Sequence, residues 1–572
     1  MRFAKTVTAL ALACSLALAI PTFAAPAAEE QAGRQEDLEL LYQTIRDRHP
    51  GPFTNTPEQE FLARIAQIEA RIDTEDSMSF GLDLQSLAAL IGDSHTTTNL
   101  NSILSSGHMF PVSVKWMDGD WVLYQVDASH QGALGQQVTS VNGFSMDQVQ
   151  EKMAPLISAD NEIKLRRQLS QVFGHQEIMV YCGLLKPEED LTLTLENGTS
   201  ITLSPLSMQD QSGWPEINGL SQQRQGSAPT DYQKGTYYFS LPLDSRTYYI
   251  QYNQCMEDPE LPMETFTAQV MADLEQGSYS VLLLDLRNNG GGSDGVIIPL
   301  LMELAPLVRS GELELWGLVG EATFSSAIIN AVELQEMGMA LVGEPASGSV
   351  DHFGAVRSGQ LPNSGLRLGV SSKYIDLGEL LDADAGRGVE PLEPDVTVAQ
   401  TMADTLAGRD TAVEWLLAHP QRLELRAYPE APLTRGRLTA LLWQAAGCPE
   451  AESGAFSDAL GIEWFLPALC WARESGAASG TGEGAFEAAR PVTRQEAAVL
   501  LLRTAELLGL EPGQPGTPPE DEAQAAPWSR EAVRWVCSAG LMETEQGRFR
   551  PEEGLTRQEG EAAVVRLSAL AG

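Results

Sequence analysis

The C-terminal part of the chain, residues 421–572, repeats itself, and this repeat constrains the fold more than any other feature. The pair Thr-Arg opens a helical pattern three times, about sixty residues apart, at Thr434-Arg435, Thr493-Arg494 and Thr556-Arg557. A tryptophan in an alanine-rich stretch, a glycine and a phenylalanine recur between these pairs. A single unit of this length cannot bury its own apolar face. We therefore expect the repeats to pack on one another as a mainly helical assembly.

The segment before the repeats, residues 234–420, alternates between strand and helix patterns. Residues 281–286 are almost wholly apolar, which is typical of a strand buried on both faces of a parallel sheet. Residues 263–274 form an amphipathic helical pattern, and 313–319 a further strand. The pattern predicts an α/β core, in which a site would lie in the loops after the strand ends.

Two smaller units are predicted upstream of this core. Residues 33–106 have apolar residues at helical spacing and predict an N-terminal helical domain. Residues 107–207 contain short alternating segments, such as Leu191-Thr-Leu-Thr-Leu195, and predict a small β module. Residues 208–233 are polar and poor in strand patterns, which indicates a linker.

The N-terminus resembles an export signal. Arg2 and Lys5 supply positive charge, an apolar run covers residues 7–20, and Thr22-Phe23-Ala24 offers small residues at a cleavage site. We expect residues 1–25 to be a cleaved signal peptide. Cys14 lacks the leucine that a lipobox places three residues before its cysteine, so cleavage without lipidation is favoured.

Charge excludes several classes of partner. The chain holds 37 Lys and Arg against 78 Asp and Glu, a formal net charge of −41. So acidic a surface repels phosphate backbones and anionic lipids, which argues against a nucleic-acid or peripheral-membrane role. No segment after the signal reaches 18 apolar residues, so no membrane span is expected. No cysteine forms a CxxC pair or stands near histidines at metal-ligand spacing, so we expect no metal and no cofactor.

The repeats resemble S-layer homology (SLH) modules. The residues that carry this resemblance are Phe456-Ser-Asp458, Trp471-Ala472, Gly476, Gly480, Phe486 and Thr493-Arg-Gln-Glu496 in one unit, and Trp528, Trp535, Gly540, Phe549-Arg-Pro551 and Thr556-Arg-Gln-Glu559 in the next. The first repeat is degenerate. The resemblance implies binding of a secondary cell-wall polymer, with Arg435, Arg494 and Arg557 contacting its anionic sugars. The same Thr and Glu residues also fit a helix capping box.

The middle of the chain resembles the tail-specific (carboxy-terminal processing) serine peptidases. The resemblance rests on Ile91-Gly-Asp-Ser-His95, Gly135-Gln-Gln-Val-Thr-Ser-Val-Asn142-Gly143, Asp285-Leu-Arg-Asn-Asn-Gly-Gly-Gly292, Thr323-Phe-Ser325-Ser326, Gly343-Glu-Pro345 and Leu361-Pro-Asn-Ser-Gly365, in this order. It implies a multidomain protein with a crotonase-like β-α-β core, a PDZ-like β module and an N-terminal helical segment. The SLH repeats would follow this core.

The resemblance places the nucleophile at Ser325, with Ser326 as the alternative. A serine that opens a helix after a strand lies near the positive end of the helix dipole, and an adjacent base can activate its hydroxyl. The glycines that follow Asp285 can turn backbone N–H groups toward a developing oxyanion. We expect the oxyanion hole to consist of Gly290 or Gly291 with Ser326.

The expected base is a histidine, because the slot in which many relatives carry a lysine, residues 346–350, contains none, and Lys373 lies too far along. The adjacent Ser94-His95 pair fits the tricorn-like branch of the family, so we expect His95 to be the base and Ser94 to support it. His352 is the alternative. An imidazole titrates near neutrality and suits this role. Glu390, or else Asp384, is the expected orienting carboxylate.

Taken together, the patterns predict an exported serine endopeptidase, held outside the cell at the cell wall or S-layer by its repeats. Its substrates would be peptides or unfolded proteins. Two alternatives remain open: a wall-bound peptide-binding protein that has lost hydrolysis, and a wall-structural protein in which the repeats are the main function.

Overall fold

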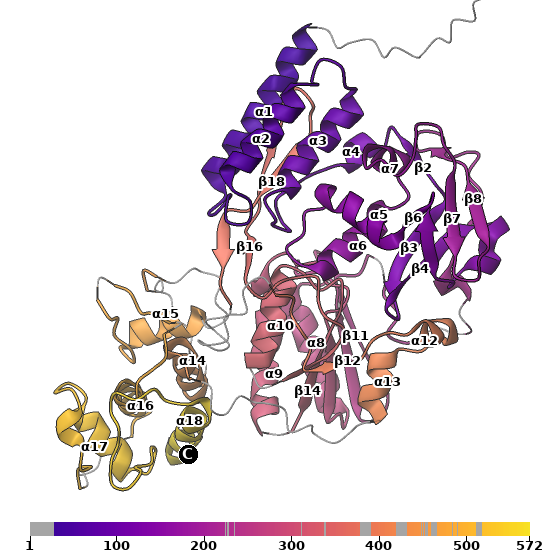
Figure 1. Ribbon diagram of the computed structural model, residues 1–572. Helices are drawn as coiled ribbons and strands as arrows, with labels where there is room; N and C mark the ends of the chain where they lie inside the picture. The colour runs from indigo at the N-terminus through magenta and orange to yellow at the C-terminus, as the bar shows by residue number, and fades with distance from the viewer. Residues whose placement is uncertain are drawn as a thin grey trace, which may run out of the picture.

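The computed structural model describes residues 28–571, apart from 224, 226–227, 234, 311, 337–338, 378–389, 419–431, 448, 450, 452–455, 459–465, 483, 489 and 511–516. The expected signal peptide and Asp384 therefore lie outside the described residues. The chain is a multidomain protein of mixed helices and sheets, with the helical repeats at its C-terminal end (Figure 1). None of the described helices is both long and apolar enough to cross a bilayer.

The N-terminal part is helical, as predicted, but a segment from far along the chain completes it. Its helices are α1 (Ala28–Arg48), α2 (Glu58–Glu69) and α3 (Ser77–Ala89). The hairpin of β17 (Arg357–Gln360) and β18 (Arg367–Val370) packs on these helices, where Leu368 and Val370 join their apolar core. Strand β1 (Thr97–Thr98) then pairs with β18. The chain segment that carries His95 is thereby tied to the hairpin.

The β module contains more of the chain than its sequence pattern indicated. Its elements are α4 (Asn101–Leu104), β2 (His108–Met109), β3 (Val112–Met117), β4 (Asp120–Asp127), η1 (Ala128–Ala133), β5 (Val138–Val141), β6 (Phe144–Ser145), α5 (Met146–Met153), η2 (Ala154–Leu156), α6 (Glu162–Val172), α7 (Gln176–Tyr181), β7 (Leu191–Leu195), β8 (Ser200–Leu203), β9 (Leu206–Ser207), β10 (Ile217–Gly219) and η3 (Leu220–Gln223). The expected linker 208–233 is not a free connection, because β10 pairs antiparallel with β4 and satisfies that strand's outer edge.

The α/β core is built on a six-stranded sheet of order β11-β12-β13-β14-β15-β20. Its elements are β11 (Tyr238–Pro242), β12 (Thr247–Tyr252), α8 (Met263–Gln276), β13 (Val281–Asp285), η4 (Asp294–Ile297), α9 (Ile298–Ser310), β14 (Glu314–Val319), α10 (Ser326–Glu336), β15 (Ala340–Gly343), β16 (His352–Gly354), β19 (Lys373–Ile375), β20 (Val396–Thr397), α12 (Met402–Ala407) and α13 (Thr411–Ala418). Strands β12 to β20 run parallel, and β11 is antiparallel at the edge.

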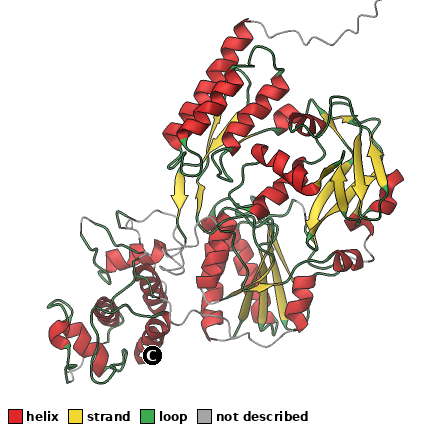
Figure 2. Cartoon of the chain, in the orientation of Figure 1, coloured by secondary structure: helices red, strands yellow, loops and turns green. Residues whose placement is uncertain are grey.

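Apolar packing on both faces of this sheet explains why its strands lack alternation. Leu282 and Leu284 of β13 face α8, α9 and α10, whereas Leu283 faces α13. Figure 2 shows the helices flanking the strands of this sheet. The loops after β13 and β14 lie at the carboxyl edge, where a parallel sheet places its functional residues. The predicted strands at 281–286 and 313–319 are confirmed.

The repeats close into a ring around three helices: α14 (Arg435–Ala445), α16 (Arg494–Leu507) and α18 (Arg557–Ala571). Helices α15 (Leu466–Ser475) and α17 (Arg530–Ser538) and the short η5 (Glu522–Gln524) lie outside them. The ring is fastened by backbone hydrogen bonds from Leu433 N to Leu555 O (2.8 Å), from Leu555 N to Val492 O (2.9 Å) and from Val492 N to Leu433 O (2.8 Å). The degenerate first repeat therefore contributes its central helix α14 and the backbone of Leu433 to the ring.

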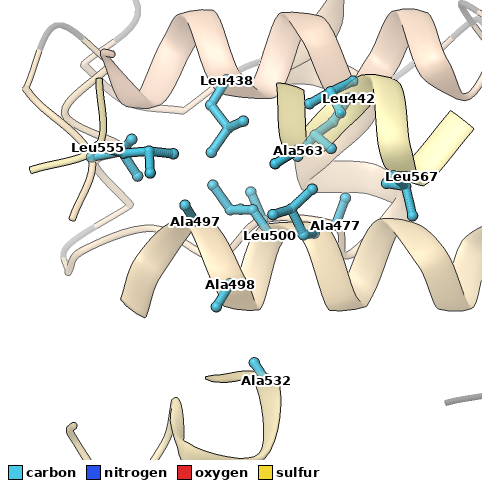
Figure 3. Packing of buried hydrophobic residues seen from close by; sticks show 14 of the residues in the cluster. Leu438, Leu442, Ala477, Ala497, Ala498, Leu500, Ala532, Leu555, Ala563 and Leu567 are labelled. Carbon is cyan, nitrogen blue, oxygen red and sulfur yellow. The ribbon is translucent and has the colours of Figure 1, made fainter. Parts of the chain in front are cut away.

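Small and branched apolar side chains fill the centre of the ring. Figure 3 shows Leu438 and Leu442 of α14, Leu500 of α16 and Ala563 of α18 gathered at this centre. All four are at least 94% buried, so each helix covers its neighbours' apolar faces. This is the mutual burial that the repeat pattern predicted.

Candidate active site and cell-wall anchor

Ser325 lies at a sharp turn between the core sheet and α10. Its φ is +56°, which non-glycine residues rarely adopt, and its carbonyl accepts a hydrogen bond from Ile328 N (2.8 Å) as the helix begins. The residue is half-buried. A strained backbone at the positive end of a helix presents the hydroxyl in a fixed direction.

The glycine loop after β13 lies directly against this turn. A Cβ on Gly291, whose φ is +98°, would come within 2.7 Å of Ser325 Cβ and 3.0 Å of Ser326 N. Only glycine therefore allows the loop to approach the serine so closely. The Ser326 hydroxyl donates to Gly292 O (2.9 Å). Because its proton is engaged there, Ser326 is less suited than Ser325 to act as nucleophile.

The three residues expected in the oxyanion hole do not have equivalent N–H groups. The Gly291 N–H donates to Asn289 Oδ1 (2.9 Å), so it is already engaged. Within the described part of the chain, no acceptor receives the N–H of Gly290 or Ser326. Gly290 is also exposed. Among these three residues, Gly290 and Ser326 thus have N–H groups without an acceptor, and Gly291 is the point of close approach to Ser325.

The structure brings His95 to the turn at Ser325. Its ring stacks on Phe324, the neighbour of Ser325, with 4.5 Å between centroids and 21° between planes. Its Nδ1 lies 3.8 Å from Asp93 Oδ1. Burial, with the nearby charge of His352 as the next cause, lowers the pKa of His95 to about 3. This differs from the near-neutral titration expected of an imidazole, and it keeps the ring uncharged.

Asp93 is the carboxylate beside this histidine, and it is completely buried. It accepts hydrogen bonds from His95 N (2.9 Å), Thr96 Oγ1 (2.6 Å) and Ser371 Oγ (2.6 Å). His49 Nε2 lies 3.3 Å from Asp93 Oδ2. Burial would raise the pKa of Asp93, but His49, His95 and the two hydroxyls outweigh it and hold the pKa below its usual value. The group is therefore a carboxylate anion at neutral pH.

His352, the alternative base, stacks on His95 at 5.4 Å between centroids. Its Nδ1 lies 3.0 Å from Ser349 O, so this nitrogen carries the proton and Nε2 keeps its lone pair. Burial lowers the pKa of His352 as well. Both candidate bases are therefore uncharged and stacked on one another, and His95 also stacks on Phe324.

Ser94 supports the site through the β module. Its hydroxyl donates to Asp160, and Asp160 N donates back to Ser94 Oγ (3.1 Å). The neighbouring Asn161 donates to Ser347 O (3.1 Å) and to Ser349 Oγ (2.9 Å) in the loop before His352. The start of α6 thus holds together the two segments that carry the histidines.

Glu390 is not placed beside either histidine. Its side chain is exposed, and its backbone carbonyl accepts a hydrogen bond from Val350 N (3.1 Å). Pairing of this segment with residues 349–350 directs the carboxylate to solvent. Lys373 is likewise exposed, on β19, so neither side chain is positioned to act on Ser325.

Sequence reasoning missed Lys164. This residue is 4% exposed, and its Nζ lies 3.4 Å from the centroid of the Phe324 ring. Burial, and after it the charge of Arg167, lowers the pKa of Lys164 to about 8. A lysine on an amphipathic helix is usually a solvated charge, so no signal in the sequence marked it.

The Thr-Arg arginines of the repeats are also buried. Arg435 and Arg494 are 5% and 2% exposed, and each guanidinium bonds to the backbone of the next repeat, at Phe486 O (3.0 Å) and Phe549 O (2.7 Å). Each also pairs with the capping-box glutamate of that repeat, Arg435 with Glu496 at 3.0 Å and Arg494 with Glu559. Arg557 is 6% exposed. These contacts join one repeat to the next.

The family model of the S-layer homology domain matches residues 455–498 and 520–559. These two segments are S-layer homology domains. A segment of 151 residues is 28% identical to the amylopullulanase of Thermoanaerobacterium thermosulfurigenes, and it covers 25% of this chain and 8% of that protein. The chain thus spans less than a tenth of that relative's length.

Solved structures of peptidases are similar to a larger part of the chain. Mature CPAF in complex with lactacystin aligns with a TM-score of 0.45 and 13% identity over 68% of this chain and 98% of its own. The photosystem II D1 C-terminal processing protease aligns with a TM-score of 0.34 and 13% identity over 68% and 99%. The tricorn protease aligns with a TM-score of 0.30 and 14% identity over 68% and 36%.

We expect Arg494→Ala to loosen the S-layer homology domains. The change removes a buried cation and leaves Phe549 O and Glu559 without their partner, so the opening free energy of residues 490–571 should fall by about 3 kcal/mol. Hydrogen-exchange mass spectrometry of the full chain measures this directly. Arg503→Ala on the same helix removes only an exposed bond to Ser479 and should change it by less than about 0.5 kcal/mol. Unchanged exchange in Arg494→Ala, together with lost wall binding, would instead indicate direct contact between Arg494 and the polymer.

Proposed function

We propose that this chain is an exported serine endopeptidase that its S-layer homology domains attach to the cell wall. The observation that carries the peptidase assignment is the juxtaposition of Ser325, strained at the start of α10, with an uncharged buried His95 stacked on its neighbour Phe324. In this proposal the six-stranded core is crotonase-like and the β module PDZ-like. We propose the domain boundaries expected from the sequence with two changes: α4 and β10 join the β module, and the β17–β18 hairpin joins the N-terminal helices.

In the proposed reaction, Ser325 Oγ attacks the carbonyl carbon of the scissile peptide bond while His95 takes its proton. The N–H groups of Gly290 and Ser326 stabilise the oxyanion that forms. His95 then gives the proton to the leaving amine, and the C–N bond breaks to leave an ester on Ser325. A water molecule attacks this ester and passes a proton to His95. His95 returns this proton to Ser325 Oγ as the ester C–O bond breaks, which releases the acid product and restores the free serine.

We assign the orienting carboxylate to Asp93 rather than to Glu390. Asp93 is buried, ionised and 3.8 Å from His95 Nδ1, so it stabilises the imidazolium that forms during the attack. His352 remains the alternative base, because its Nε2 is unprotonated and it stacks on His95. Ser94 positions the loop of His95 through Asp160.

The anchoring proposal rests on the S-layer homology domains, which imply binding of cell-wall polymers. Arg435 and Arg494 are engaged inside the ring, so we assign them the role of shaping the surface between repeats. Direct contact of Arg435, Arg494 and Arg557 with the polymer stays a prediction. The export signal and the extracellular location stay predictions as well.

One observation favours a second function, that of a wall-anchored peptide-binding protein without hydrolysis. Within the described part of the chain, Ser325 Oγ forms no hydrogen bond with His95 or His352. Catalytic hydrogen bonds in unliganded sites are often long and shorten only with substrate, so the geometry is compatible with both functions.

Turnover of an unfolded protein by Ser325→Ala and its parent separates the two functions. We expect the parent to cleave reduced, alkylated casein and the variant to be at least about 10⁴-fold slower. Ser326→Ala keeps its backbone N–H and should remain within about tenfold of the parent. Equal activity of Ser325→Ala and the parent would contradict the assignment of the nucleophile, and loss in Ser326→Ala alone would transfer it to Ser326.

A further inference from the structure

The β module contributes one cationic side chain to the proposed active site. Lys164 lies in the first turn of α6, whose N-cap Asn161 contacts the loop before His352. From there its side chain extends to the face of Phe324, which precedes the nucleophile and also stacks on His95. Phe324 and Ser325 are both half-buried, and the ammonium lies against the ring of the residue that precedes Ser325.

Lys164 has no ion-pair partner among the described residues. Within the described residues, no carboxylate lies within ion-pair distance of Lys164 Nζ and no acceptor takes a hydrogen bond from it. Asp160 and Asp93 are the carboxylates whose charges act on Lys164, but both oxygens of Asp93 and the Oδ1 of Asp160 already accept hydrogen bonds from other residues. A buried charge without a partner is costly, so an incoming anion would be strongly favoured.

The surrounding charge makes this spot unusual in so acidic a protein. Arg167, half-buried one turn further along α6, adds positive charge next to Lys164. The Phe324 ring stabilises the positive charge of Lys164 only by the weak attraction of its π face. An ammonium is a compact donor of three hydrogen bonds, which suits a carboxylate oxygen better than an amide.

We propose that the Lys164 ammonium binds a carboxylate of the peptide substrate next to the scissile bond, an inference that rests on the proposed peptidase function. The carboxylate comes either from the C-terminus of the peptide or from an aspartate or glutamate side chain. Lys164 is then a specificity-determining residue, supplied by the β module to a site whose nucleophile belongs to the core.

Cleavage of a proteome-derived peptide library by the full chain tests this proposal. Lys164→Met keeps the apolar stem, and we expect it to raise the apparent KM about 10- to 100-fold, with kcat within about threefold of the parent. With a library whose carboxylates have been converted to amides, the variant and the parent should behave alike. The matched control is Lys152→Met, because Lys152 lies over the Phe144 ring at 5.1 Å but is exposed and away from the site.

The positions of the cleavages distinguish the two sources of the carboxylate. Cleavage at a constant distance from the peptide end indicates the terminal carboxylate, and enrichment of acidic residues at one position indicates a side chain. Lys164→Arg keeps the charge and should restore part of the affinity. An equal rise in KM for the amidated library, or a fall in kcat alone, would overturn the proposal.

A second measurement does not need turnover. In the full-chain Ser325→Ala variant, acylation of Lys164 by an amine-selective reagent at pH 8 can be followed by mass spectrometry. We expect the unmodified library to slow the acylation of Lys164 at least fivefold, and the amidated library to leave it unchanged. Equal protection by both libraries would contradict carboxylate binding even if the chain proved to have no peptidase activity.

Discussion

His95→Ala should lower kcat about 10²- to 10⁴-fold, because the variant loses the imidazole that stacks on Phe324 and that we propose takes the proton of Ser325. Substrate affinity should change little, since an imidazole that acts in the transition state contributes little to ground-state binding. Steady-state kinetics with reduced, alkylated casein measures both parameters. His352→Ala, made in parallel, should keep most of the activity.

A reversed outcome, with His352→Ala inactive and His95→Ala close to the parent, would transfer the role of base to His352. His352 Nε2 is already unprotonated, so the structure makes this outcome chemically reasonable. Loss in both variants would indicate that the stacked pair acts as one unit.

The pH profile provides an independent check on the same residue. With its pKa lowered to about 3, His95 stays uncharged and able to accept a proton far below pH 6.5. Activity should therefore persist as the pH falls from 6.5 and disappear only as it approaches 3. The same shift works against folding there: the unfolded chain binds the proton below about pH 6.5 and the folded chain does not. A rate that falls by half near pH 6.5, without unfolding, would contradict the buried, uncharged state of His95.

Gly291→Ala should lower kcat at least about 10²-fold. An added Cβ would come within 2.7 Å of Ser325 Cβ and 2.9 Å of Phe324 O, on a backbone whose φ of +98° already disfavours alanine. The nucleophile turn must then move, and a displacement of about 1 Å in a catalytic group can cost about 10²-fold in rate. Steady-state kinetics, with circular dichroism to check folding, measures the effect.

Gly290→Ala is the matched control for this change. A Cβ at Gly290 meets no atom within 4 Å, and the substitution keeps the N–H that we assign to the oxyanion hole. The control should retain activity within about threefold. If both variants were equally impaired, the loss would come from the stiffness of the loop and not from contact with Ser325.

Hydrophobic periodicity predicted the elements whose burial is visible locally. The strand at 281–286 is apolar except for Asp285 because helices cover both faces of the sheet. The repeats could be predicted because each unit needs its neighbours. Strand β10 and the β17–β18 hairpin were not predictable in their places. Their partners, β4 and β1, lie far away in sequence, and three- or four-residue strands carry no pattern of their own.

The residues of the candidate site likewise include some that the sequence predicted and some that it could not. Ser325 and His95 came from a family resemblance, and the structure brings them to one turn through Phe324. The sequence showed Asp93 only as a neighbour of His95. Its burial is the reason why we propose Asp93, and not Glu390, as the orienting carboxylate. Lys164 could not be predicted, because burial of a lysine depends on the docking of α6 against the core and not on local sequence.

The central claim is that Ser325 is an activated nucleophile. Incubation of the full chain with a fluorophosphonate, followed by peptide mapping with mass spectrometry, tests it most directly. We predict one phosphonyl adduct, on Ser325, that forms much more slowly in His95→Ala and is absent from Ser325→Ala. An intact protein that remains unlabelled, or an adduct on Ser326 instead, would contradict the account.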